Sequence, residues 1–469
     1  MLGSPRVLHR YVLSPRSSPR LTAASLAWLG FANPTLKDIP VRTTALSSHP
    51  LLTRSQIVAP ALGVPDAAAA VVFGAARVRG PIARDTIAQL TSLSIATVNR
   101  QVTALLDAGL LRERADLAVS GAIGRPRVPV ELNHEPFVTL GMHVGARTTS
   151  IVAADLFGRT LDAVETPTPR APQREALAAL SDSARRYLSR WHRRRPLWIG
   201  VAVGGIVEGA TGLVHHPRLG WTSAPLGPVL AQTMQLPVSV ASHVDAMAGA
   251  ELLLGLRRFS PASGRYSHGR SSSSLYVYAR ETVGYALVID GKVHSPATGP
   301  GTIAALPVES ELLGPSGRLE STVSDEAVLV AAGRLGVLAD ANPTMPALLR
   351  AARAGSEPAQ EVLGERARVL GGAVALLRDM LNPDDLVVGG QAFTEYPEAM
   401  SRLRAAYTER STLPARDIRV TAFGNRVQEA GAGVVSLGGL YADPIGAMRR
   451  ALGASPADGA AHRPEVSVL

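Results

Sequence analysis

The sequence predicts a multidomain chain in which an N-terminal winged helix-turn-helix precedes an α/β body. Apolar residues recur three or four positions apart in two runs over residues 82–106, and the turn-prone residues 91–94 separate these runs. A Gly-Arg-Pro sequence follows at residues 124–126, as expected for the tip of a wing. From residue 137 onward, short apolar runs typical of strands alternate with helical patterns.

Composition limits the class of protein. The 469 residues are enough for two or three domains, and 46% of them are hydrophobic, which excludes a wholly disordered or fibrous chain. The net charge is +10, and residues 1–135 carry 15 basic against 8 acidic residues, so most of the excess lies in this third of the chain. The absence of cysteine excludes disulfides and thiolate metal sites. The sequence contains no apolar run long enough for a membrane span, and we expect a cytoplasmic protein.

Residues 1–60 are predicted to form a flexible basic tail. They contain seven basic residues and one acidic residue, Asp38, among many Ser, Pro and Thr residues. The composition is that of a transit peptide, but a signal-peptide core with a cleavage site is missing. Two alternatives stay open: an upstream start codon whose extra residues do not fold, and a basic arm that adds DNA affinity. Arginine supplies 46 of the 48 basic residues, which is typical of a bacterial genome rich in G and C.

Residues 61–134 are predicted to be a winged helix-turn-helix domain that binds double-stranded DNA, with its first helix over residues 67–77. Ser94 is the expected N-cap of the second helix of the motif. Val98, Val102 and Leu105 are expected in its core. The residues predicted to contact bases and phosphates are Ser94, Thr97, Asn99, Arg100 and Gln101. The alternative is a packed helical hairpin that does not bind DNA.

A wing is expected directly after this helix. Residues 107–111 end the helix at Gly109 and lead into a strand, and the wing tip is predicted at residues 120–127. Proline keeps the backbone of the tip extended, so that Arg125 and Arg127 are available to a DNA minor groove.

The body starts with strands. Residues 137–155 are expected to form two paired strands around a glycine turn, residues 173–194 an arginine-rich helix, and residues 197–203 a buried strand. Residues 260–274 are read as a polar loop, and residues 449–469 as a disordered tail.

Four segments of the body carry a resemblance to a known family. They are GVAVGGIVEGATGLVHHPRLGW, QLPVSVASHVDAMAGAELLLG, LVIDGKVHSPATG and NPDDLVVGGQAF. In order and spacing they resemble the ROK family (repressors, open reading frames and sugar kinases), whose repressors carry a winged helix ahead of the body. The resemblance implies two ribonuclease-H-like lobes of the actin-like ATPase type around a cleft. We place the first lobe at residues 135–240, completed by residues 430–448, and the second at residues 241–430.

The resemblance also shows that the catalytic residues of the family's kinases are replaced. His143 stands where the first phosphate loop has an aspartate that helps to place magnesium, and imidazole is a poor ligand for that ion. Arg280-Glu281-Thr282 stands where the second loop is rich in glycine, and Glu281 would repel phosphate. Ser242 and His243 replace the Asn-Asp pair that activates the sugar hydroxyl.

The zinc site and the sugar contacts of the family are altered in the same way. Residues 311–320 keep the glycines, the leucine and the final glutamate of the zinc segment, but none of its cysteines. Thr302 and Ala305 replace a sugar-binding glutamate and the zinc histidine, whereas Glu320 matches. The sequence therefore predicts no catalytic residues, no metal, no cofactor and no ordinary hexose recognition.

A repurposed effector cleft is the remaining candidate site of the body, around Ser242, His243, Asp245 and Glu320. Each residue also has a structural interpretation. Asp245 is expected to cap the following helix, and Glu320 to be a helix-start or surface carboxylate. The glycines at 389–390, 424, 431 and 433, at positions where the family contacts adenosine, are expected to serve close helix–strand packing. A metal role for the adjacent histidines 215 and 216 is not expected.

Taken together, the residues favour a transcriptional regulator of ROK type that is not an enzyme and that binds operator DNA as a homodimer or homotetramer. A small-molecule effector is a candidate partner. The competing hypothesis is a ROK sugar kinase with residual ATP-dependent hexose phosphorylation. A third is a regulator whose body is only an assembly scaffold.

Overall fold

The computed structural model describes residues 56–118, 128–255, 273–296, 299–314, 317–338, 343–414 and 416–453. Four predicted features therefore lie wholly or mostly outside the described residues. They are the basic tail, the wing tip with Arg125 and Arg127, the polar loop at 260–274, and the C-terminal tail.

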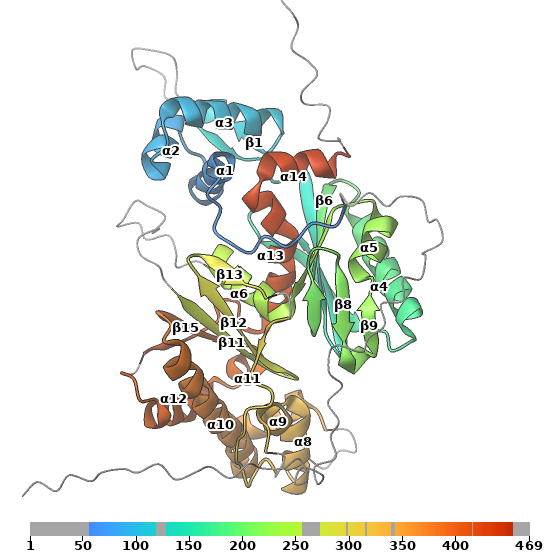
Figure 1. Cartoon of the computed structure of the whole chain (residues 1–469), viewed down its shortest axis with the longest axis vertical. Helices are drawn as coiled ribbons and strands as arrows, with labels where there is room; N and C mark the ends of the chain where they lie inside the picture. Colours follow the sequence, from blue (N-terminus) through green and yellow to red (C-terminus); the bar gives the residue numbers. More distant parts are fainter. Residues whose placement is uncertain are drawn as a thin grey trace, which may run out of the picture. The chain divides into compact units, whose positions relative to one another are not determined.

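Three helices and a two-stranded antiparallel sheet form the N-terminal helical unit, by which we mean residues 68–132 (Figure 1). The elements are α1 (Ala68–Arg79), α2 (Arg84–Thr91), α3 (Ile95–Asp107), β1 (Leu111–Glu113) and β2 (Val130–Leu132). The turn between α2 and α3 falls at residues 92–94, as predicted, with Ser92 in the left-handed conformation at φ 57°. Gly109 has φ 72° and lets the chain reverse from α3 into β1.

A five-stranded mixed sheet follows, in the order β10-β6-β3-β4-β5. Its strands are β3 (Phe137–Val144), β4 (Thr148–Ala154), β5 (Thr160–Pro167), β6 (Arg195–Val203) and β10 (Val238–Ser242). The expected strand pair and the buried strand are thus confirmed. The arginine-rich helix α4 (Gln173–Leu188) is shorter than predicted and continues into a 3-10 turn, Ser189–Trp191. Pro196 favours an extended conformation in the residue before it, where β6 begins.

Smaller elements follow β6 and surround β10. A three-stranded sheet consists of β7 (Ile206–Glu208), β8 (Leu213–His216) and β9 (Trp221–Ala224), and α5 (Leu226–Met234) precedes β10. The helix α6 (His243–Leu253) follows β10 directly.

The second mixed sheet has the order β13-β12-β11-β15-β16, with β14 paired to β12. Its strands are β11 (Ser274–Ala279), β12 (Val283–Ile289), β13 (Lys292–His294), β14 (Gly301–Thr302), β15 (Asp385–Gly389) and β16 (Ile418–Val420). Its helices are α7 (Leu319–Val323), α8 (Asp325–Arg334), α9 (Met345–Arg353), α10 (Glu357–Leu381), α11 (Gln391–Thr394) and α12 (Met400–Arg410). The long helix α10 packs along α12 and shares one hydrophobic core with β11 and β15.

The chain then returns to the first sheet through α13 (Val427–Ala442), which packs against β3, β6 and α6 and leads into α14 (Pro444–Ala451). The prediction that a tail begins at residue 449 is therefore wrong for residues 449–451, which form the last turn of α14. Small residues allow a very close approach of this helix. A Cβ atom added at Gly200 of β6 would lie 2.0 Å from the backbone nitrogen of Ser436 in α13. Of the glycines expected to serve packing, Gly389, Gly390 and Gly431 have close neighbours. Gly424 and Gly433 have none within 4 Å of an added Cβ atom, so the packing prediction is wrong for these two.

The segment ahead of α1 differs from the prediction of a free tail up to residue 60. Ile57 forms a parallel bridge with Val238, at the edge of the first sheet. Gly63 bridges Lys292, at the edge of the second sheet. The reason is that both β10 and β13 present an unpaired edge to which an extended segment can add. Residues 57–63 therefore connect the two sheets before the chain enters α1.

None of the described helices is both long enough and apolar enough to cross a membrane.

Candidate functional site

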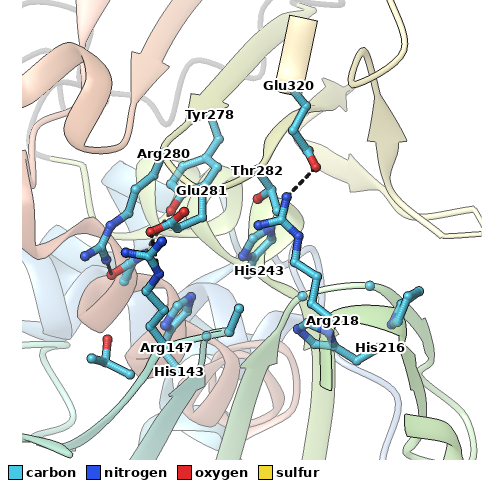
Figure 2. Close-up of a pocket in the computed structure, with 17 residues that line it drawn as sticks. His143, Arg147, His216, Arg218, His243, Tyr278, Arg280, Glu281, Thr282 and Glu320 are labelled. Atoms are coloured by element: carbon cyan, nitrogen blue, oxygen red, sulfur yellow. Dashed lines mark hydrogen bonds and ion pairs between the residues drawn. The ribbon is translucent and has the colours of Figure 1, made fainter. Parts of the chain in front are cut away.

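A cavity of about 300 Å³ lies between the two sheets, at the ends of their strands (Figure 2). Its lining comes from both lobes and from the start of α13. The polar residues at its wall are His143, Arg147, Thr148, His216, Arg218, His243, Tyr278, Arg280, Glu281, Thr282, Glu320 and Gln428. The volume suits a ligand of several non-hydrogen atoms, since a water molecule takes about 30 Å³ of liquid.

Three histidines face this cavity. The rings of His143 and His243 are stacked, with centroids 5.9 Å apart and an angle of 8° between their planes. Burial lowers the pKa of His243 to about 4 and holds the pKa of His143 well below its usual value, an effect that the neighbouring His243 reinforces. Burial likewise lowers the pKa of His216. The three rings are therefore neutral at pH 7 and offer uncharged nitrogen atoms to a ligand.

Two of these nitrogens have no partner. Nε2 of His143 and Nδ1 of His216 are buried and form no hydrogen bond, although only 3% and 5% of these residues is exposed. A buried polar atom without a partner is costly, and a bound molecule would supply one. Within the described ranges, no group of three or more His, Asp or Glu residues is arranged to hold a metal ion.

The neutral histidines predict a pH dependence of stability. Folding holds the His243 ring without its proton, so the free energy of unfolding has its full value above about pH 6.5 and falls between pH 6.5 and 4. His243→Asn removes the contribution of this residue, whereas His143 and His216 remain in both proteins. When the pH falls through this range, we expect wild type to lose about 2 to 3 kcal/mol more unfolding free energy than the variant. Urea denaturation at pH 7 and pH 4.5 measures the shift, and a constant difference would contradict the assignment.

Two ion pairs join the lobes across the mouth of the cavity, and we call them the interlobe ion pairs (Figure 2). Arg147, between β3 and β4, lies 3.1 Å from Glu281, between β11 and β12. Arg218, after β8, lies 2.6 Å from Glu320 in the first turn of α7. The second carboxylate oxygen of Glu320 accepts a hydrogen bond from the backbone N–H of Val283. Burial, reinforced by Asp325, raises the pKa of Glu281, and Arg147 opposes this shift.

The structure separates the four residues proposed for an effector cleft. His243 and Glu320 line the cavity, whereas Ser242 and Asp245 do not. The prediction that Asp245 caps α6 is wrong: the N-cap is Ser242, whose hydroxyl oxygen accepts a hydrogen bond from the Asp245 backbone N–H. Ser242 has the extended backbone that a cap requires, with ψ 146°, whereas Asp245 already lies in the first turn.

Several cavity residues were missed by sequence reasoning. Arg147, His216, Arg218, Tyr278 and Gln428 come from separate elements, and no motif of this chain relates them. The one available signal was the replacement of the family's usual residues in the two phosphate loops. It pointed to residues 143 and 280–282 but not to the residues that contact them.

The N-terminal helical unit presents a different surface, at the start of α3. The Ser94 hydroxyl oxygen accepts a hydrogen bond from the Thr97 backbone N–H at 3.1 Å, which confirms Ser94 as the N-cap. Asn99 and Arg100 are exposed, and neither forms a side-chain hydrogen bond or ion pair with a described residue. Thr97 and Gln101 are partly buried. The opposite side of the helix is the core, since Val98, Val102 and Leu105 are fully buried, as predicted.

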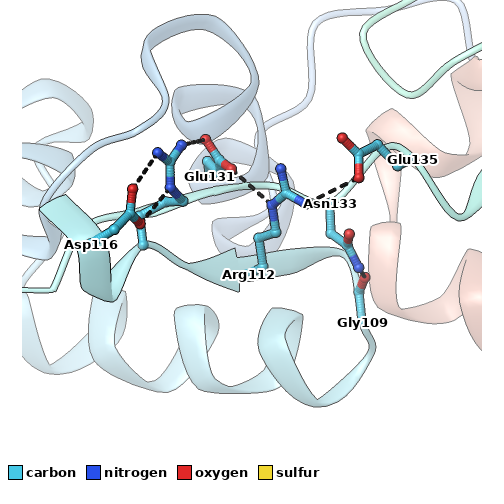
Figure 3. Close-up of polar contacts among 7 residues, drawn as sticks. Gly109, Arg112, Asp116, Glu131, Asn133 and Glu135 are labelled. Atoms are coloured by element: carbon cyan, nitrogen blue, oxygen red, sulfur yellow. Dashed lines mark hydrogen bonds and ion pairs between the residues drawn. The ribbon is translucent and has the colours of Figure 1, made fainter.

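Arg112 in β1 and Arg114, the residue after β1, form ion pairs, whereas Arg100 does not. Figure 3 shows these contacts around Glu131. Arg112 lies 2.8 Å from Glu131, and Arg114 lies 2.6 Å from Asp116 and 2.9 Å from Glu131. These pairs hold β1 to β2. Among the described arginines of the unit, Arg100, in the N-terminal half of α3, is the one without an ion pair or side-chain hydrogen bond to a described residue.

The fold agrees with comparisons to known proteins. A model of the ROK family matches residues 139–437. A protein described as a transcriptional regulator of Mycobacterium tuberculosis is 69% identical over 411 residues, covering 86% of this chain and 92% of that relative. The DNA-binding transcriptional dual regulator NagC of Escherichia coli is 23% identical over 326 residues, covering 66% of this chain and 77% of the relative.

Solved structures share the fold. A ROK family transcriptional regulator described as a homologue of the E. coli MLC protein aligns with a TM-score of 0.65 and 22% identity, covering 82% of this chain and 96% of its own. A ROK family glucokinase from Streptomyces griseus, in complex with glucose and AMPPNP, aligns with a TM-score of 0.54 and 19% identity, covering 64% of this chain and 99% of its own. The resemblance noted in the sequence is confirmed, and the chain belongs to the ROK family.

Proposed function

We propose that this chain is a sequence-specific DNA-binding transcriptional regulator whose N-terminal helical unit is a winged helix-turn-helix. The observation that carries the proposal is the start of α3, where a capped helix exposes Asn99 and Arg100 without a described partner. A recognition helix contacts base edges with residues near its N-terminal end. The names of the relatives, a transcriptional regulator and NagC, support the same function.

The cleft between the lobes acts as an effector site in this proposal. It offers neutral imidazoles, guanidinium groups and a cavity of about 300 Å³, which suit a small polar molecule. Binding of such a molecule supplies partners for His143 and His216 and competes with the interlobe ion pairs. The cleft thereby acquires two states, one with and one without those pairs.

The helix α13 connects this cleft with the N-terminal helical unit. At its start, Gln428 lines the cavity and donates a hydrogen bond to the Tyr278 hydroxyl at 2.9 Å. Near its end, the Tyr441 ring lies 4.3 Å from the guanidinium carbon of Arg77 in α1 and 6.2 Å from the Phe73 ring. A helix of 16 residues is about 24 Å long. One rigid element therefore reaches from the ligand site to α1.

Regulators of this kind assemble symmetrically, and we propose a homodimer or homotetramer that acts in the cytoplasm and binds an operator with two-fold symmetry. The test is selection of bound duplexes from a randomised library at near-physiological salt, using the full chain. The expected result is a two-fold symmetric motif. Recovery of unrelated duplexes only, with weak and strongly salt-sensitive binding, would leave basic charge as the sole source of DNA affinity.

Sugar kinase activity is the competing function, and the wall of the cleft argues against it. Glu281 occupies the second phosphate loop and is paired with Arg147, where backbone N–H groups would have to approach phosphate. His143 is buried and neutral at the position of the magnesium-placing aspartate. We expect no ATP-dependent phosphorylation of common hexoses or amino sugars. Turnover that His243→Asn abolishes would restore the kinase hypothesis.

A further inference from the structure

Six arginines occupy residues 185–195, a segment of the first lobe that contains no acidic residue. The segment includes the last turn of α4, the 3-10 turn Ser189–Trp191 and the first residue of β6. Five of the six side chains are exposed and form what we call the arginine patch: Arg185, Arg186, Arg190, Arg193 and Arg195. The sixth, Arg194, is partly buried and donates hydrogen bonds to the backbone carbonyl oxygens of His134, which follows β2, and of Phe137, the first residue of β3.

Most of the positive charge of the patch is not neutralised. Arg185 lies 2.8 Å from Asp182, and Arg190 lies 3.1 Å from Asp162. The other three form no ion pair with any residue in the described ranges. A helix C-terminus favours cations in its last turn, which accounts for Arg185 and Arg186. This effect is confined to that turn and does not account for Arg193 and Arg195, which lie beyond the helix.

The arginine patch lies next to the N-terminal helical unit. Arg194 donates to the carbonyl oxygens of His134, two residues after β2, and of Phe137, the first residue of β3. The Asn133 amide, next to His134, donates to the Gly109 carbonyl oxygen, two residues after α3. The helix α14 packs against both α3 and β6 (Figure 1). The last turn of α14 adds two more exposed arginines, Arg449 and Arg450. Exposed arginines therefore lie both on segment 185–195 and on α14, the helix that contacts α3 and β6.

We propose that the arginine patch binds phosphates of the DNA that flanks the operator, so that the first lobe extends the footprint of the winged helix. This inference rests on the proposed DNA-binding function. Duplex DNA carries one negative charge per about 1.7 Å of its axis, and a row of exposed guanidinium groups fits such a backbone without reading its sequence. The patch therefore adds affinity and salt dependence but leaves the selected motif unchanged.

The experiment compares the full chain with a triple variant, Arg186→Gln, Arg193→Gln and Arg195→Gln, in which no described ion pair is broken. The matched control removes the same charge from helices of the second lobe, by Arg350→Gln, Arg404→Gln and Arg410→Gln. Affinity is measured from 50 to 200 mM salt on two duplexes. One contains only the selected motif, and the other is extended by about 10 base pairs, one helical turn, on each side.

On the extended duplex, we expect the patch variant to bind at least tenfold more weakly than wild type at low salt. The slope of log K against log salt should fall by about 0.9 for each phosphate that the variant no longer neutralises. On the short duplex the difference should shrink, and the control should match wild type on both. Equal affinity of the patch variant and wild type on the extended duplex, or an equal decrease in the control, would overturn the proposal.

The outcome also separates this proposal from the proposed function. If wild type selects a motif but the patch variant has the same salt slope as wild type, the patch is only a solvated surface. The regulator hypothesis then stands without the patch proposal. If wild type selects no motif, the proposed function fails and the patch proposal fails with it.

Discussion

Replacing Asn99 and Arg100 with alanine is expected to abolish recognition of the selected motif while leaving the fold intact. Both side chains are exposed and have no described partner, so their removal leaves no buried group unsatisfied. Removing one base-contacting side chain costs about 1 to 3 kcal/mol of binding free energy and relaxes specificity at the base pair that it reads. Fluorescence anisotropy with the motif and with a scrambled duplex measures both effects.

The matched control for this prediction is Arg350→Ala, which removes the same charge from α9 in the second lobe. Its motif affinity should equal that of wild type. If the Asn99 and Arg100 variant keeps the wild-type preference for the motif over the scrambled duplex, α3 is not the recognition helix.

The second large effect is expected at the contact between β6 and α13. Gly200→Ala places a methyl group 2.0 Å from the Ser436 backbone nitrogen and 2.5 Å from the Val435 carbonyl carbon, and backbone atoms cannot rotate away as a side chain can. We expect the free energy of unfolding to fall by about 3 kcal/mol or more, as for severe overpacking. Denaturation in urea measures this decrease.

Gly433→Ala is the control, because Gly433 lies in α13 and a Cβ atom added there meets nothing within 4 Å. Replacing glycine by alanine within a helix stabilises it by about 0.5 to 1 kcal/mol, so this variant should equal or exceed wild type in stability. If Gly200→Ala is as stable as Gly433→Ala, α13 does not lie on the sheet as closely as described.

Local patterns in the sequence were sufficient to predict the helices of the N-terminal helical unit and the first strands of the body. The apolar spacing of Val98, Val102 and Leu105 places them on one side of α3, and all three are buried. Ser94 is a cap because its side chain reaches a backbone N–H three residues away. Such features depend on neighbours within a few residues, which periodicity and cap preferences describe.

Features that depend on distant segments were not predictable in this way. Residues 57–63 adjoin and partly overlap the predicted tail, yet they pair with the edges of two sheets, at Val238 and Lys292. The interlobe ion pairs join residues more than a hundred positions apart, such as Arg218 and Glu320. The resemblance to the ROK family pointed to a cleft between lobes, but it did not indicate which side chains pair with one another across it.

The measurement that tests the account most directly is operator affinity across a broad panel of small polar metabolites, in wild type and in Gln428→Ala. The account predicts that at least one compound raises the thermal stability of both proteins and changes the operator affinity of wild type. In the variant, which lacks the hydrogen bond from α13 to Tyr278, the change in affinity should be reduced or abolished. If no compound alters either quantity in wild type, the cleft is not an effector site and the body serves only for assembly.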